Sequence, residues 1–477
     1  MRRPSAGYNP AMDGPVEESG LNGSGGRAPW EDGTVLRVSG VASGTARVPT
    51  SKSIAQRALV AAALCHGRTR FGALPDGEDV AFAARWADQL GLVVARHGRA
   101  SLSVQGCPPG PSRGLGGLSS EPWRVGESGT LARLLLGVAG LASWVGRTVT
   151  VEASGSLLRR EPGPLLGALA RAGSSITPRG GPWPVQVTAV GPPSEVLLDA
   201  PRSSQEVSSL LLALAAWPDH GALRVRGVIP SAPYVGLTRW TLERFGVQTE
   251  EHLQSETERV FFVKGPLRAP EQPFLIEPDA SAASVALAAA CLSGGRVTVP
   301  GLSRDSAQGD VRIVEHLRAF GCGAGFDETG AWAEGSAVRG ASVDLGGEPD
   351  LAPVLVPMAV SAARRVGGTS ELTGLGTLEG KESPRLSVLA GFCRSLGCAV
   401  EASADGLVIG PSPGATGGGA VHLEGHGDHR MVFAALLLGL VEPGVRVSGH
   451  RAVAKSWARA LTDLEGLGLR FDESPHG

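Results

Sequence analysis

Cations and hydroxyl groups cluster at the points where apolar helices are expected to begin. In "SKSIAQRALVAAAL", residues 51–64, the apolar run predicts a buried helix, yet Lys52 and Arg57 lie in its first two turns. A helix N-terminus carries a partial positive charge, so a cation there costs roughly a few tenths of a kcal/mol. The same end presents free backbone N–H groups that bind anions. This stretch therefore predicts a site where an anion lies between the cations and the helix end.

The same pattern occurs five more times, at intervals of about 70 to 80 residues. The segments are "GESGTLARLLLGVAGL" from 126, "SSQEVSSLLLALAAW" from 203, "DASAASVALAAACL" from 279, "PDLAPVLVPMAVSAA" from 349 and "GDHRMVFAALLLGL" from 427. Each is followed by a β-like run and by a second, amphipathic helix ending in Gly, which suits the positive-φ position after a helix. The chain therefore consists of six copies of one α/β unit. Six units could form a closed ring, a solenoid or two pseudo-threefold domains, and the pattern alone does not choose among them.

Each helix start carries residues that can bind or transfer charge. They are Lys52, Ser53 and Arg57; Gly129, Thr130 and Arg133; Ser203, Ser204 and Gln205; Asp279 and Ser281; Asp350; and Asp428, His429 and Arg430. The Ser, Thr and Asp residues are equally well explained as N-caps, which accept a hydrogen bond from the first helical turn. The cations have no such explanation. Their repetition favours one cleft at which several helix starts meet around an anion.

Three further clusters of charge lie elsewhere in the repeats. "SLLRRE" (156–161) contributes Arg159 and Arg160, "KESPR" (381–385) contributes Lys381, Glu382 and Arg385, and "VAKSW" (453–457) contributes Lys455. By itself, each cluster is more typical of a solvated surface patch than of a binding site.

The composition is that of a globular protein with no overall preference for polyanions. Among 477 residues, 42% are hydrophobic and 19% are charged, and the formal net charge is −2. This balance gives no global attraction to nucleic acid or membrane, so an anion site must be local. The six cysteines form no C-x-x-C pair and no Cys/His cluster with metal spacing, so we expect reduced thiols, a cytoplasmic location and no metal. We also expect no signal peptide, no membrane span, and a disordered extension over residues 1–33.

The helix-start motifs and the three charged clusters resemble those of the 5-enolpyruvylshikimate-3-phosphate synthase family (3-phosphoshikimate 1-carboxyvinyltransferases), which belongs to the enolpyruvyl transferases. They occur in the family's order over about residues 40–470. The resemblance implies an α/β fold with two domains, inverse α/β barrel-like, built of six βαβαββ repeats with three per domain. One domain is expected to comprise residues 34–50 and 275–477, and the other residues 51–274. The active-site cleft is expected between them.

The resemblance also implies a reaction. The family transfers the enolpyruvyl group of phosphoenolpyruvate to the 5-hydroxyl of shikimate 3-phosphate, in the shikimate pathway to chorismate and the aromatic amino acids. It implies two small-molecule substrates, no cofactor, no nucleic-acid or membrane partner, a monomer, and inhibition by glyphosate. Both substrates are polyanions, which accounts for many Lys and Arg residues around one cleft.

Individual roles follow from the same resemblance. Glu382 is the expected proton donor to C3 of the enol with Lys52 assisting, and Asp350 is the expected base toward the hydroxyl, although the two carboxylates could exchange roles. The expected phosphoenolpyruvate ligands are Lys52, Gly129, Thr130, Arg160, Gln205, Arg385, His429, Arg430 and Lys455. The expected shikimate 3-phosphate ligands are Lys52, Ser53, Arg57, Ser203, Ser204, Gln205, Ser231, Tyr234, Asp350 and Lys381.

The sequence departs from the family pattern at several positions that flank these residues. They are Glu127, Glu161, Pro278, Pro384 and Ala458. These departures leave open a divergent enolpyruvyl transferase of a specialised pathway with a shikimate-like acceptor. A non-catalytic anion-binding relative would be expected to lack Asp350 or Glu382. A UDP-N-acetylglucosamine enolpyruvyl transferase is disfavoured because its catalytic-loop Cys motif has no counterpart in this sequence.

Overall fold

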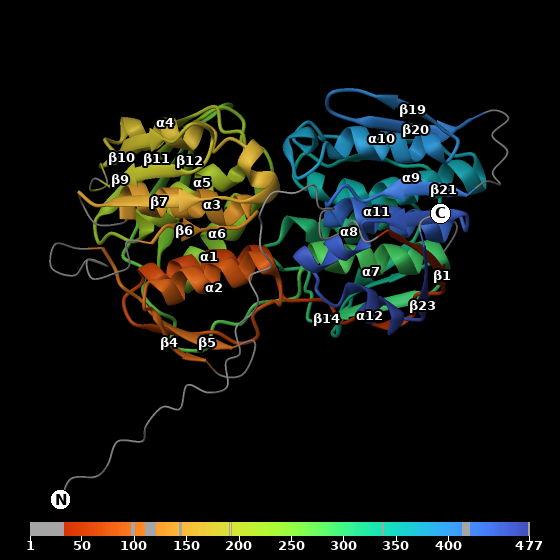
Figure 1. Cartoon of the computed structure of the whole chain (residues 1–477), viewed down its shortest axis with the longest axis horizontal. Coiled ribbons are helices and arrows are strands. Elements are labelled where there is room, and N and C mark those ends of the chain that lie inside the picture. Colours follow the sequence, from red (N-terminus) through yellow and green to blue (C-terminus); the bar gives the residue numbers. More distant parts are fainter. Residues whose placement is uncertain are drawn as a thin grey trace, which may run out of the picture.

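Two lobes lie side by side in the computed structural model of the chain (Figure 1). The structure describes residues 33–96, 101–109, 121–142, 146–189, 191, 193–335, 338–412 and 420–475. The extension expected over residues 1–33 lies outside the described residues except for Gly33. Each lobe has its own hydrophobic core, around Leu59 and Leu211 in the first lobe and around Leu287 and Leu437 in the second.

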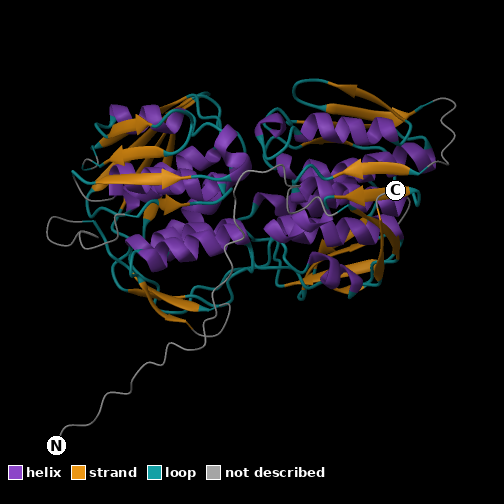
Figure 2. Cartoon of the chain, viewed as in Figure 1, coloured by secondary structure: helices purple, strands orange, loops and turns teal. Residues whose placement is uncertain are grey.

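Three central helices run through each lobe and are buried on nearly all sides. They are α1 (Lys52–Leu64), α3 (Gly129–Gly137) and α5 (Ser204–Ala215) in the first lobe, and α7 (Ala280–Ser293), α9 (Ala352–Val366) and α11 (His429–Val441) in the second. In α1, every residue from Ile54 to Leu64 is buried, Arg57 included. A helix that is apolar on all faces needs packing partners all round. Sheets and outer helices provide these partners (Figure 2).

Polar residues at most of these helix starts are N-caps, as one of the two interpretations of the sequence predicts. The side chains of Ser203, Asp279 and Asp428, all named above as possible caps, each accept a backbone N–H of the following turn. In α1 and α3 the cap is instead Ser51 or Ser128, which precedes the residues named above. Helix α9 differs, because a 3-10 turn, η4 (Pro349–Leu351), precedes it and no side chain caps it. The carboxylate of Asp350 is therefore not used as a cap.

The first lobe contains three sheets with the orders β3-β5-β4, β6-β7-β9-β8 and β10-β11-β13-β12. Their strands are β3 (Arg68–Arg70), β4 (Val93–Arg96), β5 (Leu102–Gln105), β6 (Trp123–Arg124), β7 (Thr148–Glu152), β8 (Ser175–Pro178), β9 (Val185–Thr188), β10 (Glu195–Asp199), β11 (His220–Arg226), β12 (Gln248–Ser255) and β13 (Glu258–Lys264). The other helices are α2 (Glu78–Gln89), α4 (Pro164–Arg171), α6 (Pro233–Arg244), the π-helical η1 (Val138–Ala142) and the 3-10 helix η2 (Gly155–Arg159).

The second lobe contains three four-stranded sheets with the orders β15-β16-β14-β2, β17-β18-β20-β19 and β21-β22-β1-β23. Their strands are β1 (Thr34–Gly40), β2 (Gly44–Thr45), β14 (Arg296–Pro300), β15 (Gly323–Phe326), β16 (Gly330–Glu334), β17 (Ser342–Asp344), β18 (Ser370–Thr373), β19 (Cys398–Ala402), β20 (Leu407–Pro411), β21 (Val421–Glu424), β22 (Val445–Ser448) and β23 (Leu469–Pro475). The other helices are α8 (Ile313–Ala319), α10 (Arg385–Ser395), α12 (Ala460–Glu465), η3 (Gly309–Arg312), η5 (Leu378–Gly380) and η6 (His450–Lys455).

The element order confirms the six-repeat prediction. In one unit, β10 and β11 pair in parallel across α5, and α6 then leads into the antiparallel pair β12 and β13, which gives βαβαββ. The units of β6 to β9 and β17 to β20 repeat this arrangement. In the first unit, the segment 267–274 makes parallel bridges beside β3 in place of a fourth strand.

The chain crosses between the lobes twice, and the two crossings lie against each other. Strands β1 and β2 complete sheets of the second lobe before the chain enters the first. Thr50 forms an antiparallel bridge with Pro278 on the returning segment. The Oδ2 of Asp279, which caps α7, accepts the backbone N–H of Lys52 at 3.2 Å. One carboxylate therefore joins the first turns of α1 and α7 across the lobe boundary.

Glu206 is a buried acid in the first turn of α5. Its Oε2 accepts the backbone N–H of Arg202 at 3.0 Å. Burial raises the pKa of Glu206 to about 7. Because the folded-state pKa lies above the unfolded-state pKa, the fold disfavours the carboxylate form. The resulting loss of stability is absent below about pH 4, grows as the pH rises, and is complete above about pH 7.

We therefore expect Glu206→Gln to gain stability relative to the wild type as the pH is raised from 5 to 8. The gain over that interval is on the order of 2 kcal/mol. Between about one and two units of the pKa shift of Glu206 take effect between pH 5 and pH 8, and each unit corresponds to about 1.36 kcal/mol. Urea unfolding at both pH values measures it. The control is Glu161→Gln, which removes an exposed acid. A difference between Glu206→Gln and wild type that does not change with pH would contradict the assignment.

Candidate active site

The first turns of the central helices meet at one cavity between the lobes. It encloses about 720 Å³, part of it open to solvent. The structure brings nearly all predicted site residues to its wall: Lys52, Ser53, Arg57, Gly129, Thr130, Arg160, Ser203, Ser204, Gln205, Ser231, Tyr234, Asp350, Lys381, Glu382, Arg385, His429 and Arg430. Lys455 is the predicted residue that does not line this cavity. Asp79, which the sequence analysis did not single out, does line it.

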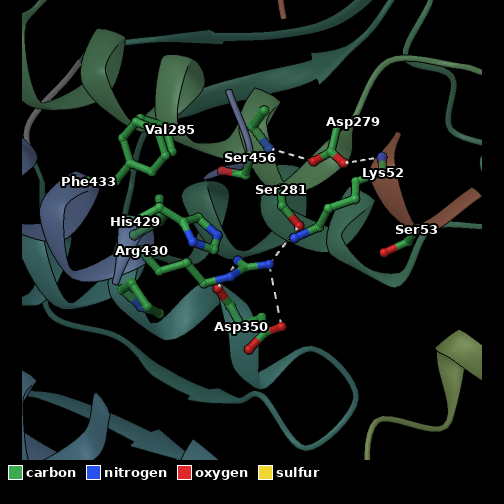
Figure 3. A pocket seen from close by; sticks show the side chains of 13 residues that line it. Lys52, Ser53, Asp279, Ser281, Val285, Asp350, His429, Arg430, Phe433 and Ser456 are labelled. Atoms are coloured by element: carbon green, nitrogen blue, oxygen red, sulfur yellow. Dashed lines mark hydrogen bonds and ion pairs between the residues drawn. The ribbon is translucent and has the colours of Figure 1, made fainter. Parts of the chain in front are cut away.

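A second, narrower cavity adjoins the first, and the two share several wall residues, including Lys52, Asp350 and Arg430. Figure 3 shows this region, where Arg430 points between Ser281 and Asp350. One side of the cavity is apolar, formed by Val285 and Phe433. The arrangement places charged groups against a partly apolar wall, which strengthens electrostatic interactions by keeping water away.

Lys52 is held by a carboxylate from the neighbouring helix. Its Nζ lies 3.0 Å from Oδ2 of Asp79, in α2. Burial disfavours the ammonium, but the Asp79 carboxylate outweighs this, so the pKa of Lys52 is raised. The cation at the start of α1 is therefore charged and partly neutralised.

Arg57 is a buried cation surrounded by neutral groups. Its side chain is 1% exposed, and it donates to the Oγ1 of Thr238 at 2.7 Å and to the carbonyl of Ser53 at 2.9 Å. In the described part of the chain no carboxylate lies within ion-pair distance of Arg57. Burial lowers the pKa of Arg57 to about 10, which still leaves it charged at neutral pH. A buried charge without a partner is costly, so this site favours an anionic ligand.

The guanidinium groups of Arg133 and Arg160 lie close to Gly129. A Cβ on Gly129 would lie 3.0 Å from Nη2 of Arg160 and 3.1 Å from Nη1 of Arg133. Arg133 donates to neutral acceptors, the carbonyl of Glu161 and Oε1 of Gln205. Burial, and then the neighbouring Arg160, lower the pKa of Arg133 to about 10. Two guanidinium groups therefore face a space that the missing side chain of Gly129 keeps open.

Asp350 lies at the centre of the cations of the second lobe. Its Oδ1 is 2.9 Å from Nη1 of Arg385 and 3.3 Å from Nζ of Lys381, and its Oδ2 is 3.4 Å from Nη2 of Arg430. Burial alone would raise the pKa of Asp350, but these three cations hold it well below its usual range. Asp350 is therefore ionised.

Glu382 bridges the two lobes. Its Oε2 accepts from Nη2 of Arg385 at 2.5 Å, and its Oε1 lies 3.6 Å from Nη1 of Arg160 in the first lobe. Burial opposes ionisation, yet the charges of Arg385 and Arg160 hold the pKa of Glu382 well below its usual range. Any anion that binds to these two guanidinium groups competes directly with Glu382.

His429 and Asp428 begin α11 and have different tasks. Burial, and then the charge of Lys52, lower the pKa of His429 to about 3, so its imidazole is neutral. Asp428 is fully buried and caps α11, and its Oδ2 accepts a hydrogen bond from Nε of Arg385 at 2.7 Å. In the sequence Asp428 is recognisable only as a helix-start residue, whereas in the structure it also orients Arg385.

Asp310, which the sequence analysis missed, connects the lobes behind Arg430. It accepts from Ser281, whose Oγ also accepts from Nη2 of Arg430 at 3.3 Å, and it lies 3.5 Å from the hydroxyl of Tyr234 in the first lobe. Burial raises the pKa of Asp310 to about 6. The segment "QGD" (308–310) lacks the pattern of an apolar helix start, so the search for such starts passed over it.

Within the described ranges, no cluster of His, Cys, Asp and Glu could hold a metal ion. In the same part of the chain, no helix is long and apolar enough to cross a membrane. All six cysteines lie within the described residues as thiols, and five of them are buried. Lys, Arg, His and carboxylate side chains line the cavity, together with hydroxyl groups.

The family model described as "EPSP synthase (3-phosphoshikimate 1-carboxyvinyltransferase)" matches residues 37–464. The chain belongs to the EPSP synthase family. A 3-phosphoshikimate 1-carboxyvinyltransferase of Methanoculleus marisnigri is 32% identical over 425 residues, covering 88% of this chain and 96% of the relative. A protein of the same name from Methanopyrus kandleri is 34% identical over 438 residues, covering 89% of this chain and 96% of the relative.

Solved structures agree on the fold, so the predicted two-domain enolpyruvyl-transferase fold is confirmed. An EPSP synthase from Acinetobacter baumannii has a TM-score of 0.72 at 21% identity, covering 92% of this chain and 99% of that structure. The enolpyruvyl transferase NikO from Streptomyces tendae has a TM-score of 0.65 at 18% identity, covering 94% of this chain and 99% of that structure. At these identities the structural likeness concerns the fold alone.

The unpaired buried cations predict that simple anions stabilise the protein. We expect inorganic phosphate, compared with chloride at equal ionic strength, to raise the melting temperature by about 2 to 5 °C through binding to the folded state. In Arg57→Gln this phosphate-dependent rise should be at least halved. Thermal unfolding followed by fluorescence measures it. The control is Arg224→Gln, because Arg224 is already paired with Glu195 and Glu258. An equal phosphate effect in all three proteins would contradict the site.

Proposed function

We propose that this protein transfers the enolpyruvyl group of phosphoenolpyruvate to the 5-hydroxyl of shikimate 3-phosphate, releasing phosphate, in the route to chorismate and the aromatic amino acids. The observation that carries the proposal is the convergence of six cations, Arg57 among them without an acidic partner within the described residues, with the two ionised carboxylates of Asp350 and Glu382 in one inter-lobe cavity. Membership of the EPSP synthase family and relatives named 3-phosphoshikimate 1-carboxyvinyltransferase support it. Two polyanionic substrates would supply the counter-charges that the cavity lacks.

On the donor side, we propose that phosphoenolpyruvate binds around Gly129. The guanidinium groups of Arg133 and Arg160 face this space, and Thr130 is held by Nε2 of Gln205 at 2.9 Å. Arginine pairs suit carboxylate and phosphate groups because each can donate two parallel hydrogen bonds. Lys52, Arg385, His429, Arg430 and Lys455 would complete the donor site.

On the acceptor side, we propose that shikimate 3-phosphate binds against α1, α5 and α6. Arg57 supplies the unpaired charge there, and Ser203, Ser204 and Ser231 supply hydroxyl donors. Ser231 has a positive φ of 53°, which orients this turn toward the cavity wall. Ser53, Gln205, Tyr234, Asp350 and Lys381 would contact the remainder of the acceptor.

The chemistry requires a proton at C3 of the enol and removal of the proton from the attacking hydroxyl. The hydroxyl oxygen forms a bond to C2 while C3 takes up a proton, and the tetrahedral intermediate then loses phosphate as C3 gives its proton back. Asp350 is ionised and can accept the hydroxyl proton. Glu382 is ionised by Arg160 and Arg385, and substrate anions competing for these cations would raise its proton affinity. This favours Glu382 as the group that exchanges the proton with C3, with Lys52 assisting.

We further propose that residues 34–50 with 275–477 and residues 51–274 are domains that close on the substrates. Cavity residues come from both lobes, and the contact between Arg160 and Glu382 spans them. Closure would exclude water from the reacting atoms. We propose that the enzyme acts as a cytoplasmic monomer.

A second candidate function is enolpyruvyl transfer to a different, shikimate-like acceptor. Glu161 supports it, because this acid lines an adjoining pocket, which shares Arg160 and Lys381 with the cavity, and pairs with Arg202 at 3.1 Å. Such a pair beside the cavity changes the distribution of charge that an entering acceptor meets. A non-catalytic anion-binding protein is a weaker candidate because both Asp350 and Glu382 are in place.

The acceptor assay tests the proposal. Purified protein with phosphoenolpyruvate should release phosphate when shikimate 3-phosphate is added, and Glu382→Gln should slow this release about 100-fold or more. Phosphate release measured with each of several shikimate-like acceptors separates the two candidate functions. Release with another acceptor but none with shikimate 3-phosphate would refute the main proposal and support the second candidate. No release with any acceptor would refute both.

Gly129→Ala tests the placement of the donor. The added methyl group would press on Arg133 and Arg160, so we expect glyphosate inhibition to weaken about tenfold or more. The KM for shikimate 3-phosphate should change less than twofold, because that site lies on other residues. Steady-state kinetics at several glyphosate concentrations measure both. Unchanged inhibition would show that the donor site is not at Gly129.

A further inference from the structure

Glu127 is an acid close in sequence to the proposed donor site. It precedes Ser128, the N-cap of α3, and lies two residues before Gly129. Its Oε2 accepts the hydroxyl of Ser156 at 2.6 Å and the backbone N–H of Ser156 at 3.2 Å. Both bonds come from the turn that also carries Arg160. The carboxylate is therefore fixed beside the proposed donor site.

The same oxygen is bound to a cation of the other lobe. Nζ of Lys455, at the end of η6, lies 3.4 Å from Oε2 of Glu127 and donates to the carbonyl of Gly427 at 3.0 Å. Gly427 immediately precedes Asp428, His429 and Arg430. The ammonium thus lies next to the second lobe's anion-binding residues, yet it does not line the cavity.

We propose that Glu127 is a built-in anion that holds Lys455 until phosphoenolpyruvate displaces it, and that Glu127 thereby sets the affinity for the donor. The proposal rests on the proposed function for the identity of that donor. Glu127 contacts no reacting atom and acts through Lys455, so it is a positioning residue. The ion pair also joins the lobes, which couples donor binding to their relative position.

Removing the charge of Glu127 has two opposing effects on the affinity for phosphoenolpyruvate, and their relative size decides whether the affinity rises or falls. Loss of an inter-lobe ion pair would weaken closure, but both side chains are 20 to 25% exposed, and pairs of that kind contribute little. Removing a negative charge a few ångströms from a polyanion, and freeing an ammonium to meet it, is the larger effect. Glutamine keeps an acceptor oxygen for Ser156, so the turn is retained. The net result is tighter donor binding.

The test is Glu127→Gln in the full-length enzyme. We expect the KM for phosphoenolpyruvate to fall about three- to tenfold, while the KM for shikimate 3-phosphate changes less than twofold. Glu152→Gln is the control, since it removes a first-lobe acid that pairs with Arg124 instead and does not line the cavity, and it should leave the KM for phosphoenolpyruvate within twofold. An unchanged or increased KM in Glu127→Gln overturns the proposal.

A second background shows whether the effect passes through Lys455. In Lys455→Met, adding Glu127→Gln should lower the KM for phosphoenolpyruvate by a clearly smaller factor than in the wild-type background, because only the relief of charge repulsion is left once the ammonium that Glu127 holds is gone. An equal fall in both backgrounds overturns the role of Lys455. Glu127→Ala, which should shift the KM in the same direction, replaces the glutamine variant if that one does not fold.

Failure of this proposal can be told apart from failure of the proposed function. If the wild type releases no phosphate with shikimate 3-phosphate, the proposed function fails. Calorimetric titration with phosphoenolpyruvate then tests Glu127 without turnover. A Kd three- to tenfold lower in Glu127→Gln than in wild type still supports the proposal, and an equal or higher Kd overturns it.

Discussion

Uncompensated positive charge at buried helix starts is the constraint on which this structure depends. Arg57 is fully enclosed and has only neutral acceptors around it, and Arg133 is in a similar position. Burying such charges is expensive unless an anion is present. By contrast, Arg385 is equally buried but is neutralised by Asp428 and Asp350. The cavity therefore contains both internally paired cations and cations that depend on a ligand.

The repeat architecture creates this constraint. Three helices that are apolar on all faces fill each lobe, so their polar first turns are the parts that must reach a surface. The βαβαββ units orient them so that these ends come together at the boundary between the lobes (Figure 1). Asp279 then serves both lobes, since it caps α7 and accepts the first N–H of α1.

Buried carboxyl groups in this protein differ in pKa because the charges around them differ. Asp350 and Glu382 remain ionised because two or more cations outweigh the effect of burial. Asp310 and Glu206 are buried with fewer charges near them, and burial raises their pKa values. A buried carboxyl group in this protein thus has a lowered or a raised pKa according to the cations within a few ångströms.

The sequence by itself determined the local features. The six apolar runs, the caps at Ser203, Asp279 and Asp428, and the position of Gly129 all follow from neighbouring residues, because capping and helix periodicity act over a few positions. The residues assigned by resemblance to known motifs also reached the cavity, with the exception of Lys455. Only the tertiary structure decided which charges meet. Lys455 and Glu127 are 328 residues apart, Arg385 and Asp428 are 43 apart, and Asp310 lies in a segment without a helix-start pattern. Such pairs depend on how the lobes are placed against each other, and no local spacing in the chain encodes that placement.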